Sequence, residues 1–127
     1  MVMLIKYKQS YKKIAMGLLS YMPEEKDVKK LQETVQQYEE TDDWQLFMWK
    51  EDDDIVGVVG LRYTENGDAE LHHVCVNPSY RDEGIGKKMV QAVRGRLDHD
   101  LVASKETVQF LQVCDEHQKD ILENEVN

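Results

Sequence analysis

The N-terminal third of the chain carries the apolar pattern of one strand followed by two helices. Leu4 to Tyr7 is a short apolar run that is compatible with a strand. Ser10 is a residue type that caps helices, and apolar residues recur after it at helical spacing. Pro23 interrupts this spacing at a position that suits the first turn of a second helix. The predicted apolar stripes are Ile14, Leu18 and Met22 in the first helix, and Val28, Leu31, Val35 and Tyr38 in the second.

The middle of the chain has the pattern of three successive antiparallel strands. Aromatic and β-branched residues dominate Trp44–Trp49 and Ile55–Leu61, and the polar turn Asp52–Asp54 separates the two runs. This composition favours two strands joined as a hairpin. Asn66-Gly67 predicts a two-residue turn, because both residue types tolerate a positive φ, and it leads into a third strand over Glu70–Val76.

The last part of the chain predicts a helix, a short strand and a second short helix. Pro78 ends the preceding strand because proline has no N–H for the ladder. A helix with apolar residues at helical spacing follows, from Gly84 to near Leu97. Leu101–Ala103 is long enough only for a brief strand, and Thr107–Cys114 predicts a short helix. Residues 115–127 are acidic and poor in apolar side chains, which predicts a mobile tail.

This order of elements predicts an α/β (α+β) fold in one domain over residues 1–127, with a mixed, mostly antiparallel sheet flanked by helices. Apolar residues make up 41% of the chain, which is sufficient for one core. No apolar stretch approaches the roughly 20 residues that cross a bilayer, and the N-terminal segment lacks the pattern of a signal peptide. We therefore expect a cytoplasmic protein without a membrane partner.

The cysteines and the charge balance argue against several kinds of site. Cys75 and Cys114 show neither zinc-binding spacing nor a disulfide framework, so we expect two reduced thiols and no metal site. The 16 Lys and Arg residues against 25 Asp and Glu residues give a formal net charge of −9. This charge argues against nucleic acid as a partner. An anionic ligand must therefore be held by a local group of donors.

The most specific chemical pattern connects the strand predicted over Glu70–Val76 with the helix predicted from Gly84. Glycines let a ligand approach the backbone, and the first N–H groups of a helix have no intrahelical acceptor, so this loop can hold a phosphate. Arg81 and Lys87 add positive charge at the same helix start. The Walker loop and the dinucleotide fingerprint with three glycines are both absent. The segment reads Val74-Cys75-Val76-Asn77-Pro78-Ser79-Tyr80-Arg81-Asp82-Glu83-Gly84-Ile85-Gly86-Lys87.

The string Arg81-x-x-Gly84-x-Gly86, preceded by a strand that ends at Val76-Asn77-Pro78, resembles the acetyl-CoA signature of the GNAT N-acetyltransferase family. The predicted order of elements is also similar to that family's order, from its first strand through its fourth helix. The resemblance implies a GNAT-like domain with a shortened C-terminal end and with acetyl-CoA as cosubstrate. It implies cofactor contacts from Val74, Cys75 and Val76, which would pair with the pantetheine arm, and from Arg81, Asp82, Glu83, Gly84, Ile85, Gly86 and Lys87.

A narrower resemblance concerns a group of short members of this family. Lys13–Ser20, the segment Gln45-Leu46-Phe47 and the short chain are similar to the RibT-type group, which is encoded among riboflavin-synthesis genes in Bacillus-type bacteria. This resemblance implies a link to riboflavin metabolism.

A GNAT reaction needs a base that deprotonates the amine and an acid that protonates the departing thiolate. Glu70 is the first candidate base, because its spacing from Arg81 is similar to that of the catalytic glutamate in histone-type members. His72 is the second candidate, as a base or as part of a water chain. Alternatively, Glu70 is a solvated carboxylate near a turn and His72 is a hydrogen-bonded structural histidine.

Strand alternation predicts the faces of these side chains. Glu70, His72, Val74 and Val76 are expected on one face, and Leu71, His73 and Cys75 on the other.

The acid is not evident from the sequence. The family's pattern places a tyrosine after a phenylalanine in the fourth helix, whereas here Phe110 is followed by Leu111. Leucine cannot donate a proton, so another group or water must protonate the thiolate, or transfer is inefficient. The family's final two strands, which frame the acceptor, also have no counterpart after Cys114. The acceptor site is therefore shallow, completed by a partner chain in a homodimer, or absent.

These patterns favour an N-acetyltransferase that acts on a small amine or a protein amino group by direct attack in a ternary complex. The alternative is a non-catalytic acyl-CoA-binding or regulatory module, because the acid and part of the acceptor wall are missing. A third interpretation makes the acidic segment 23–43 a surface for a basic protein or a riboflavin-pathway enzyme, although charge runs are usually solvated helix faces.

Overall fold

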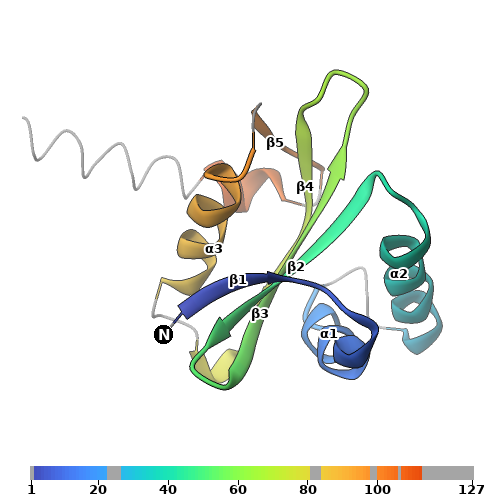
Figure 1. Ribbon diagram of the computed structural model, residues 1–127, viewed down its shortest axis with the longest axis vertical. Helices are drawn as coiled ribbons and strands as arrows, with labels where there is room; N and C mark the ends of the chain where they lie inside the picture. Colours follow the sequence, from blue (N-terminus) through green and yellow to red (C-terminus); the bar gives the residue numbers. More distant parts are fainter. Residues whose placement is uncertain (1, 23–26, 81–83, 98–99, 106, 113–127) are drawn as a thin grey trace, which may run out of the picture.

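The computed structural model describes residues 2–22, 27–80, 84–97, 100–105 and 107–112, and Figure 1 shows how their elements are arranged. The strands are β1 (Val2–Lys6), β2 (Trp44–Glu51), β3 (Asp54–Tyr63), β4 (Ala69–Val76) and β5 (Leu101–Ala103). The helices are α1 (Lys12–Leu19), α2 (Val28–Glu40) and α3 (Ile85–Arg94), with short 3₁₀ turns η1 (Gln9–Tyr11) and η3 (Pro78–Tyr80). Residues 108–112 are also helical.

The strands form one five-stranded sheet in the order β1-β2-β3-β4-β5. β1 to β4 pair antiparallel, whereas β5 pairs parallel with β4. The parallel pair requires a crossover connection, and α3 provides it. The predicted fold, a mixed and mostly antiparallel sheet flanked by helices, is confirmed.

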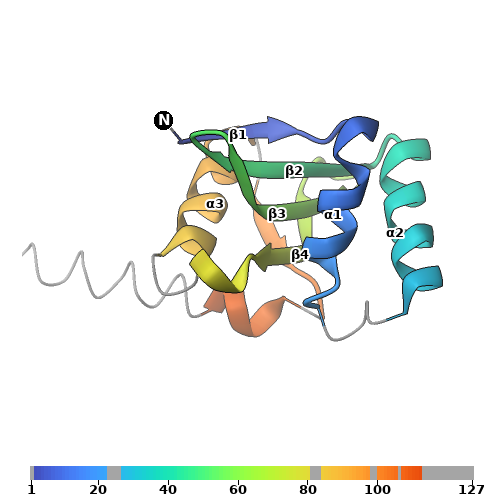
Figure 2. The ribbon, with the colours of Figure 1, turned by 90° about the horizontal axis from the view of Figure 1, so that it is seen from below.

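Helices cover both faces of the sheet, with α1 and α2 on one face and α3 on the other (Figure 2). The alternation of side chains along β2 supplies both cores. Leu46 and Met48 pack with α1 and α2, and Phe47 and Trp49 pack on the side of α3. Because all four side chains are buried, β2 reads as a continuous apolar run.

The first two helices differ in detail from the predicted ones. α2 begins at Val28, where the Asp27 side chain accepts a hydrogen bond from Lys29 N at 3.1 Å and caps the helix. The predicted start at Pro23 lies outside the described residues. Val28 is 62% exposed and Ile14 is 44% exposed, so both are wrong as core positions. α1 instead buries Ala15, Leu18 and Leu19.

The connection between β3 and β4 is longer than the predicted two-residue turn. Gly67 has φ of 91°, but Asn66 does not have a positive φ. Thr64 N donates to Asp68 O at 2.8 Å, and Gly67 N donates to Thr64 O at 3.0 Å. These bonds close a loop over residues 64–68, so only the glycine needs the left-handed conformation.

Candidate active site

An extra residue in β4 changes which side chains share a face of the sheet. Gly60 of β3 pairs with His73, and the next residue, Leu61, pairs with Leu71, so His72 is the additional residue of a β-bulge. The predicted alternation is therefore wrong across the bulge. Val74 and Val76 pack with Leu71 on the α3 side, whereas His73 and Cys75 lie on the side of α1 and α2.

The bulge gathers polar and aromatic side chains from α2, β2, β3 and β4 on the side of α1 and α2. His72 Nε2 lies 3.1 Å from Glu70 Oε1, and Arg62 donates to the same carboxylate at 3.2 Å. The His72 ring packs on the Trp44 ring, with centroids 4.6 Å apart. We call this group the bulge cluster: Tyr38, Trp44, Arg62, Glu70, His72 and His73. The sequence placed His73 away from Glu70 and His72, and the bulge brings all three together.

Tyr38 reaches the bulge cluster because β3 has a glycine beneath it. The Tyr38 hydroxyl lies 2.5 Å from His73 Nδ1. A Cβ on Gly60 would lie 1.9 Å from the Tyr38 hydroxyl oxygen, so no other residue type fits under this ring without movement. The ring also packs edge-on against Trp44 and His73, with centroids 5.6 Å away in each case. A glycine inside a β-branched strand was the one sequence signal of this close approach.

Hydrogen bonds hold Glu70 in its ionised form. The bond from His72, with the weaker effect of Arg62, lowers the pKa of Glu70 below its ordinary value, against a smaller opposing effect of burial. Its side chain is 30% exposed, so the carboxylate remains in contact with water. A carboxylate with a lowered pKa is a weak base, and it is better suited to accept and orient the N–H of His72.

The C-terminal half of β4 has one open edge within the described part of the chain. β5 pairs with Ala69, Glu70 and Leu71 only. Asn77 N donates to Val56 O at 2.7 Å, and alternation then turns the N–H and C=O of Cys75 toward β3. The backbone groups of Val74 and Val76 therefore point to the open edge.

The start of α3 lies just beyond this edge. Gly84 has φ of 72° and ψ of 19°, and its carbonyl accepts the first helical bond, from Lys88 N at 3.1 Å. The N–H groups of residues 85–87 thus have no helical acceptor. Lys87 is half-buried at this position and Lys88 is exposed. The predicted ligand residues Arg81, Asp82 and Glu83 lie outside the described residues.

Gly86 has a packing role that the sequence did not indicate. A Cβ at this position would lie 3.0 Å from Phe110 Cζ and 4.0 Å from Val76 Cγ2. The helical segment 108–112 thus takes the space next to Gly86, whereas no atom of the described residues lies within 4 Å of a Cβ built on Gly84. Among the described residues, Gly84 rather than Gly86 leaves open space beside the helix start.

Leu111 occupies the core on the α3 side and is 6% exposed. Its N–H donates to Thr107 O at 3.0 Å, and the Thr107 hydroxyl donates to Leu71 O at 2.6 Å. These bonds hold the helical segment 108–112 next to the half of β4 that pairs with β5. Leu111 therefore has a structural position, and Cys114 lies outside the described residues. Cys75 is a buried thiol on the side of α1 and α2.

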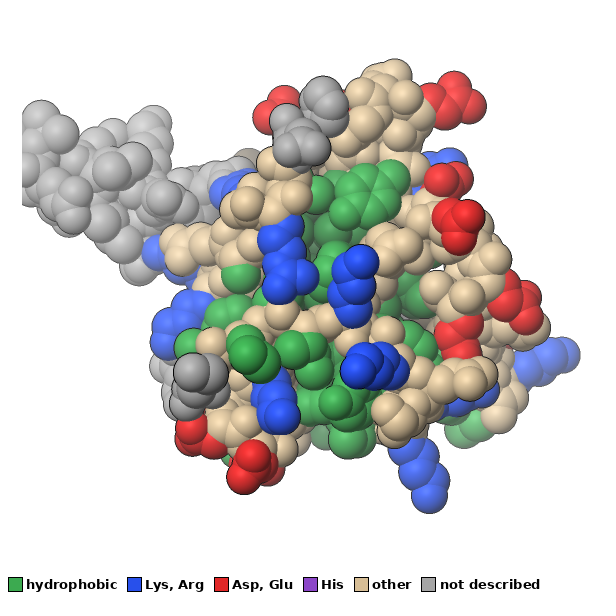
Figure 3. All heavy atoms as spheres, in the orientation of Figure 1, with side chains coloured by type: hydrophobic (Ala, Val, Ile, Leu, Met, Phe, Trp, Pro, Cys, Tyr) green, Lys and Arg blue, Asp and Glu red, His purple; other side chains and the backbone are tan. Residues whose placement is uncertain are grey.

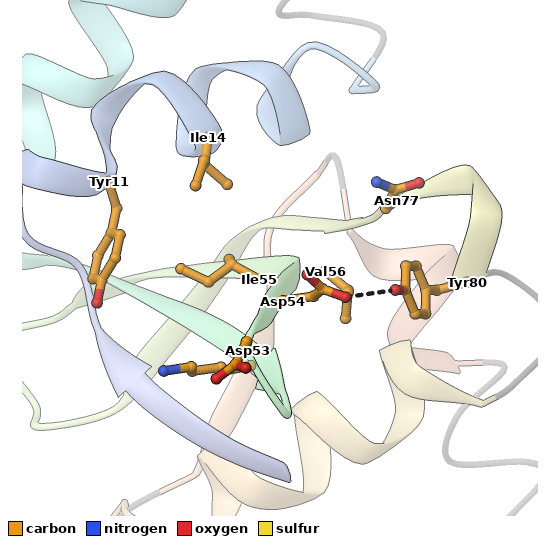
Figure 4. Close-up of a pocket in the computed structure, with 9 residues that line it drawn as sticks. Tyr11, Ile14, Asp53, Asp54, Ile55, Val56, Asn77 and Tyr80 are labelled. Atoms are coloured by element: carbon orange, nitrogen blue, oxygen red, sulfur yellow. Dashed lines mark hydrogen bonds between the residues drawn. The ribbon is translucent and has the colours of Figure 1, made fainter. Parts of the chain in front are cut away.

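A groove of about 560 Å³ opens at the other end of β4, between α1 and the β2–β3 hairpin (Figure 4). Ile14 and Ile55 point into the groove. On its wall, the Tyr80 hydroxyl donates a hydrogen bond to Asp54 Oδ2 at 3.2 Å. The groove thus joins apolar and acidic side chains where β4 leads into η3. Its lining comprises Tyr11, Ile14, Lys50, Asp53, Asp54, Ile55, Val56, Asn77 and Tyr80.

The charges are unevenly distributed over the surface. On the face shown in Figure 3, Lys and Arg side chains gather across the middle and Asp and Glu side chains lie toward the rim. Within the residues that the structure describes, no group of three or more His, Cys, Asp and Glu side chains is arranged to hold a metal ion. In that same part of the chain, no helix has the length and apolar character that crossing a membrane requires.

Comparison with known proteins identifies the family. The model of the acetyltransferase (GNAT) family matches residues 12–119. An uncharacterized N-acetyltransferase encoded in the lysA 3' region of Bacillus methanolicus is 51% identical over 114 residues, which cover 89% of this chain and 95% of the relative.

Two solved structures share the fold at low sequence identity. A possible acetyltransferase from Clostridium difficile 630 superimposes with a TM-score of 0.74 at 12% identity, covering 92% of this chain and 89% of the other. The aminoglycoside N-acetyltransferase AAC(6')-Iy in complex with CoA superimposes with a TM-score of 0.71 at 15% identity, covering 91% and 86%. With the family match and the Bacillus relative, these findings show that the chain belongs to the GNAT family and is a GNAT-type N-acetyltransferase.

Proposed function

We propose that the protein binds acetyl-CoA along the open edge of β4 and transfers the acetyl group to an amine by direct attack in a ternary complex. The open edge beyond the bulge carries the proposal, because it presents backbone groups of Val74 and Val76 that β5 does not pair. The pantetheine arm contains two amides, which can add to this edge as a strand would. The solved relative in complex with CoA supports CoA as the ligand of this fold.

The pyrophosphate is assigned to the start of α3. The N–H groups of residues 85–87 and the positive end of the helix favour an anion there. Lys87 and Lys88 add charge, and the open space beside Gly84 lets the ligand approach the backbone. Arg81, Asp82 and Glu83 precede this helix start in the chain, and their contacts with the cosubstrate stay a prediction.

His72 is the base that the geometry of the bulge cluster favours, with Glu70 behind it. If His72 Nε2–H donates to the Glu70 carboxylate, Nδ1 carries a lone pair that can take a proton from the amine. Glu70 is already held by Arg62 and His72, so its function is to orient the imidazole. The order of the two candidates is thus reversed relative to the sequence analysis.

The acceptor is proposed to be a small amine or a protein amino group. Trp44 and Glu70 place an aromatic ring and a carboxylate near the base, a combination that suits a cationic amine. A homodimer that completes the acceptor site and a link to riboflavin metabolism remain predictions that follow from the family resemblance. An acyl-CoA-binding module without transfer is the second candidate, favoured by the burial of Leu111 at the expected acid position.

Calorimetry with acetyl-CoA and an assay of thiol release with a panel of amines test this function. We expect binding, and release of CoA that depends on one class of amine. Binding without accelerated thiol release from any amine would favour the binding module. Absence of binding would contradict both candidates.

A matched pair of variants tests the open edge itself. Val76→Pro removes an N–H that points to the open edge, so acetyl-CoA should bind about tenfold more weakly while the fold persists. Cys75→Pro removes an N–H that points to β3 and should lower thermal stability instead. Equal acetyl-CoA affinity of folded Val76→Pro and the unmodified protein would place the cosubstrate elsewhere.

A further inference from the structure

The sequence shows no acid at the position where this family carries a tyrosine, and the structure places Leu111 in the core. We propose that Tyr38 and His73 together form the proton donor for the departing CoA thiolate, with the proton passing from the Tyr38 hydroxyl through the imidazole of His73. This inference rests on the proposed function, because it needs acetyl-CoA on the open edge of β4.

Contacts on several sides hold the Tyr38 hydroxyl in place. The hydroxyl lies 2.5 Å from His73 Nδ1, and Tyr38 as a whole is only 7% exposed. Gly60 leaves the space that this hydroxyl occupies, since a Cβ there would be 1.9 Å from it. Two ring contacts hold the phenol from the sides. The hydroxyl and the imidazole are therefore held in one geometry, which a proton relay between them requires.

The proposed path of the pantetheine arm leads to His73. β5 pairs with β4 only as far as Leu71, and the open edge begins at the bulge that contains His72 and His73. A pantetheine arm that runs along Val76 and Val74 from the start of α3 ends at this bulge. The thioester would therefore lie beside both histidines, one backed by Glu70 and the other by Tyr38.

The two histidines then differ in their proton states. The Glu70 carboxylate accepts from His72 Nε2–H, which leaves Nδ1 of that ring as a base. The Tyr38 hydroxyl and His73 Nδ1 share a hydrogen bond. We assign the hydroxyl as its donor, and in that tautomer the ring proton of His73 is on Nε2. Neighbouring rings on one strand thus serve as acceptor and donor of protons.

In the proposed step the acetyl group moves from the CoA sulfur to the amine nitrogen. The amine nitrogen forms a bond to the thioester carbon, and the C–S bond breaks with its electron pair leaving on sulfur. His72 takes the proton from the attacking nitrogen. His73 Nε2–H passes its proton to sulfur while the Tyr38 O–H proton moves to Nδ1, and solvent returns a proton to the phenolate and removes one from His72.

Within the described residues, ionisable groups near this pair come from β4, β3 and α2. On β4 they are Glu70 and His72, with the Cys75 thiol buried two residues beyond His73. β3 contributes Arg62, which is bound to Glu70. On α2, Glu39 follows Tyr38 and acts on Tyr7, whose pKa burial raises to about 12.

Titration of the bound CoA thiol tests the proposal without any acceptor. The thiolate absorbs in the ultraviolet, so the pH at which it forms can be read in the complex of the protein with CoA. A donor at His73 stabilises the thiolate, and we expect the bound thiol to ionise about one to two pH units lower than in His73→Phe. Tyr38→Phe should lose part of this shift, and the double variant should match His73→Phe alone.

Tyr7→Phe is the matched control, because it removes a buried hydroxyl that has no partner within the described residues. This variant should leave the thiol titration unchanged. Nitrogen NMR of the free protein gives an independent readout, in which His73 should carry its proton on Nε2.

The outcomes separate this inference from the proposed function. If CoA binds and its thiol ionises equally in the unmodified protein, Tyr38→Phe and His73→Phe, the Tyr38–His73 donor is wrong and the acetyl-CoA site stands. A proton on Nδ1 of His73 in the free protein would also overturn the inference. If calorimetry finds no CoA binding, the proposed function and this inference both fail.

Discussion

The two ends of β4 are built differently. Ala69 to Leu71 lie between β3 and β5, and Thr107 adds a hydrogen bond to Leu71 O from the following helix. Val74 to Val76 pair with β3 only, and their other edge is open in the described structure. One inserted residue, His72, separates the two ends. The first end is paired with a strand on both sides, and the second has backbone groups that a ligand can bind.

This comparison shows what one bulge does to a strand. Without it, the two histidines would face opposite sides of the sheet, because neighbouring residues alternate. With it, His72 and His73 both lie on the side of α1 and α2, each next to a hydrogen-bonding partner. The bulge therefore concentrates polar chemistry at the position where the open edge begins.

Of the changes considered, removal of the proposed base at the open end of β4 should have the largest effect. His72→Gln should lower kcat by about 10²-fold or more, because a positioned general base contributes that much. Acetyl-CoA affinity should stay the same, since the backbone edge is untouched. Steady-state kinetics with an amine from the panel, together with calorimetry, measures both values. A kcat within twofold of the unmodified protein would exclude His72 as the base.

Gly60→Ala should disturb the bulge cluster, because the added methyl group points at the Tyr38 ring. The new methyl group overlaps the Tyr38 hydroxyl, so the free energy of unfolding should fall by about 1–3 kcal/mol. The matched control is Gly17→Ala in α1, where no described atom lies within 4 Å of the added Cβ and alanine should stabilise the helix by about 0.5–1 kcal/mol. Denaturant unfolding compares the two. Equal stability changes would mean that Tyr38 is not confined by Gly60.

A phenol at position 111 would test the end of β4 that pairs with both β3 and β5. Leu111 lies in the core on the α3 side, so Leu111→Tyr should cost about 1–3 kcal/mol of stability and bring no gain in turnover. Gln112→Tyr places the same side chain on an exposed neighbour and should be neutral. Thermal unfolding and thiol release measure both properties. Faster turnover of folded Leu111→Tyr would restore the short helix as the source of the acid.

The smallest effect concerns the pH dependence of stability. The folded-state pKa of Glu70 lies below its ordinary value of 4.5, so its interactions stabilise the fold above that pH and are lost as pH falls through the folded pKa. Glu70→Gln should therefore be less stable by about 0.2–1 kcal/mol at pH 7 and equally stable in strong acid. Urea titrations at several pH values show this, with Glu65→Gln as an exposed control. A difference that persists in strong acid would assign the effect to packing.

Much of the architecture was predictable because it depends on local patterns. The apolar run of β2 and the ends of β4 and β5 agree with the predicted strands to within about two residues. Periodicity failed where a neighbouring residue type decided the outcome. Asp27 caps α2 and sets its start at Val28, and Ala15 rather than Ile14 brings α1 close to the sheet.

The candidate site was predictable only as a segment. The glycines before α3 and the proline after β4 are local signals, and they located the proposed phosphate loop and the end of the strand. Glu70 and His72 were found as neighbours two residues apart. The assignment of Gly86 to ligand approach could not include Phe110, because that contact joins residues far apart in the chain.

By itself, the sequence of this protein determined the order of its elements, the loop between β4 and α3 and the absence of a tyrosine at position 111. These features depend on residue type and on spacing along the chain. Only the tertiary structure decided that His73 joins Glu70 and His72 and that Tyr38 reaches the sheet over Gly60. A bulge arises from the mismatch of two paired strands, so neither strand alone contains the information that positions it.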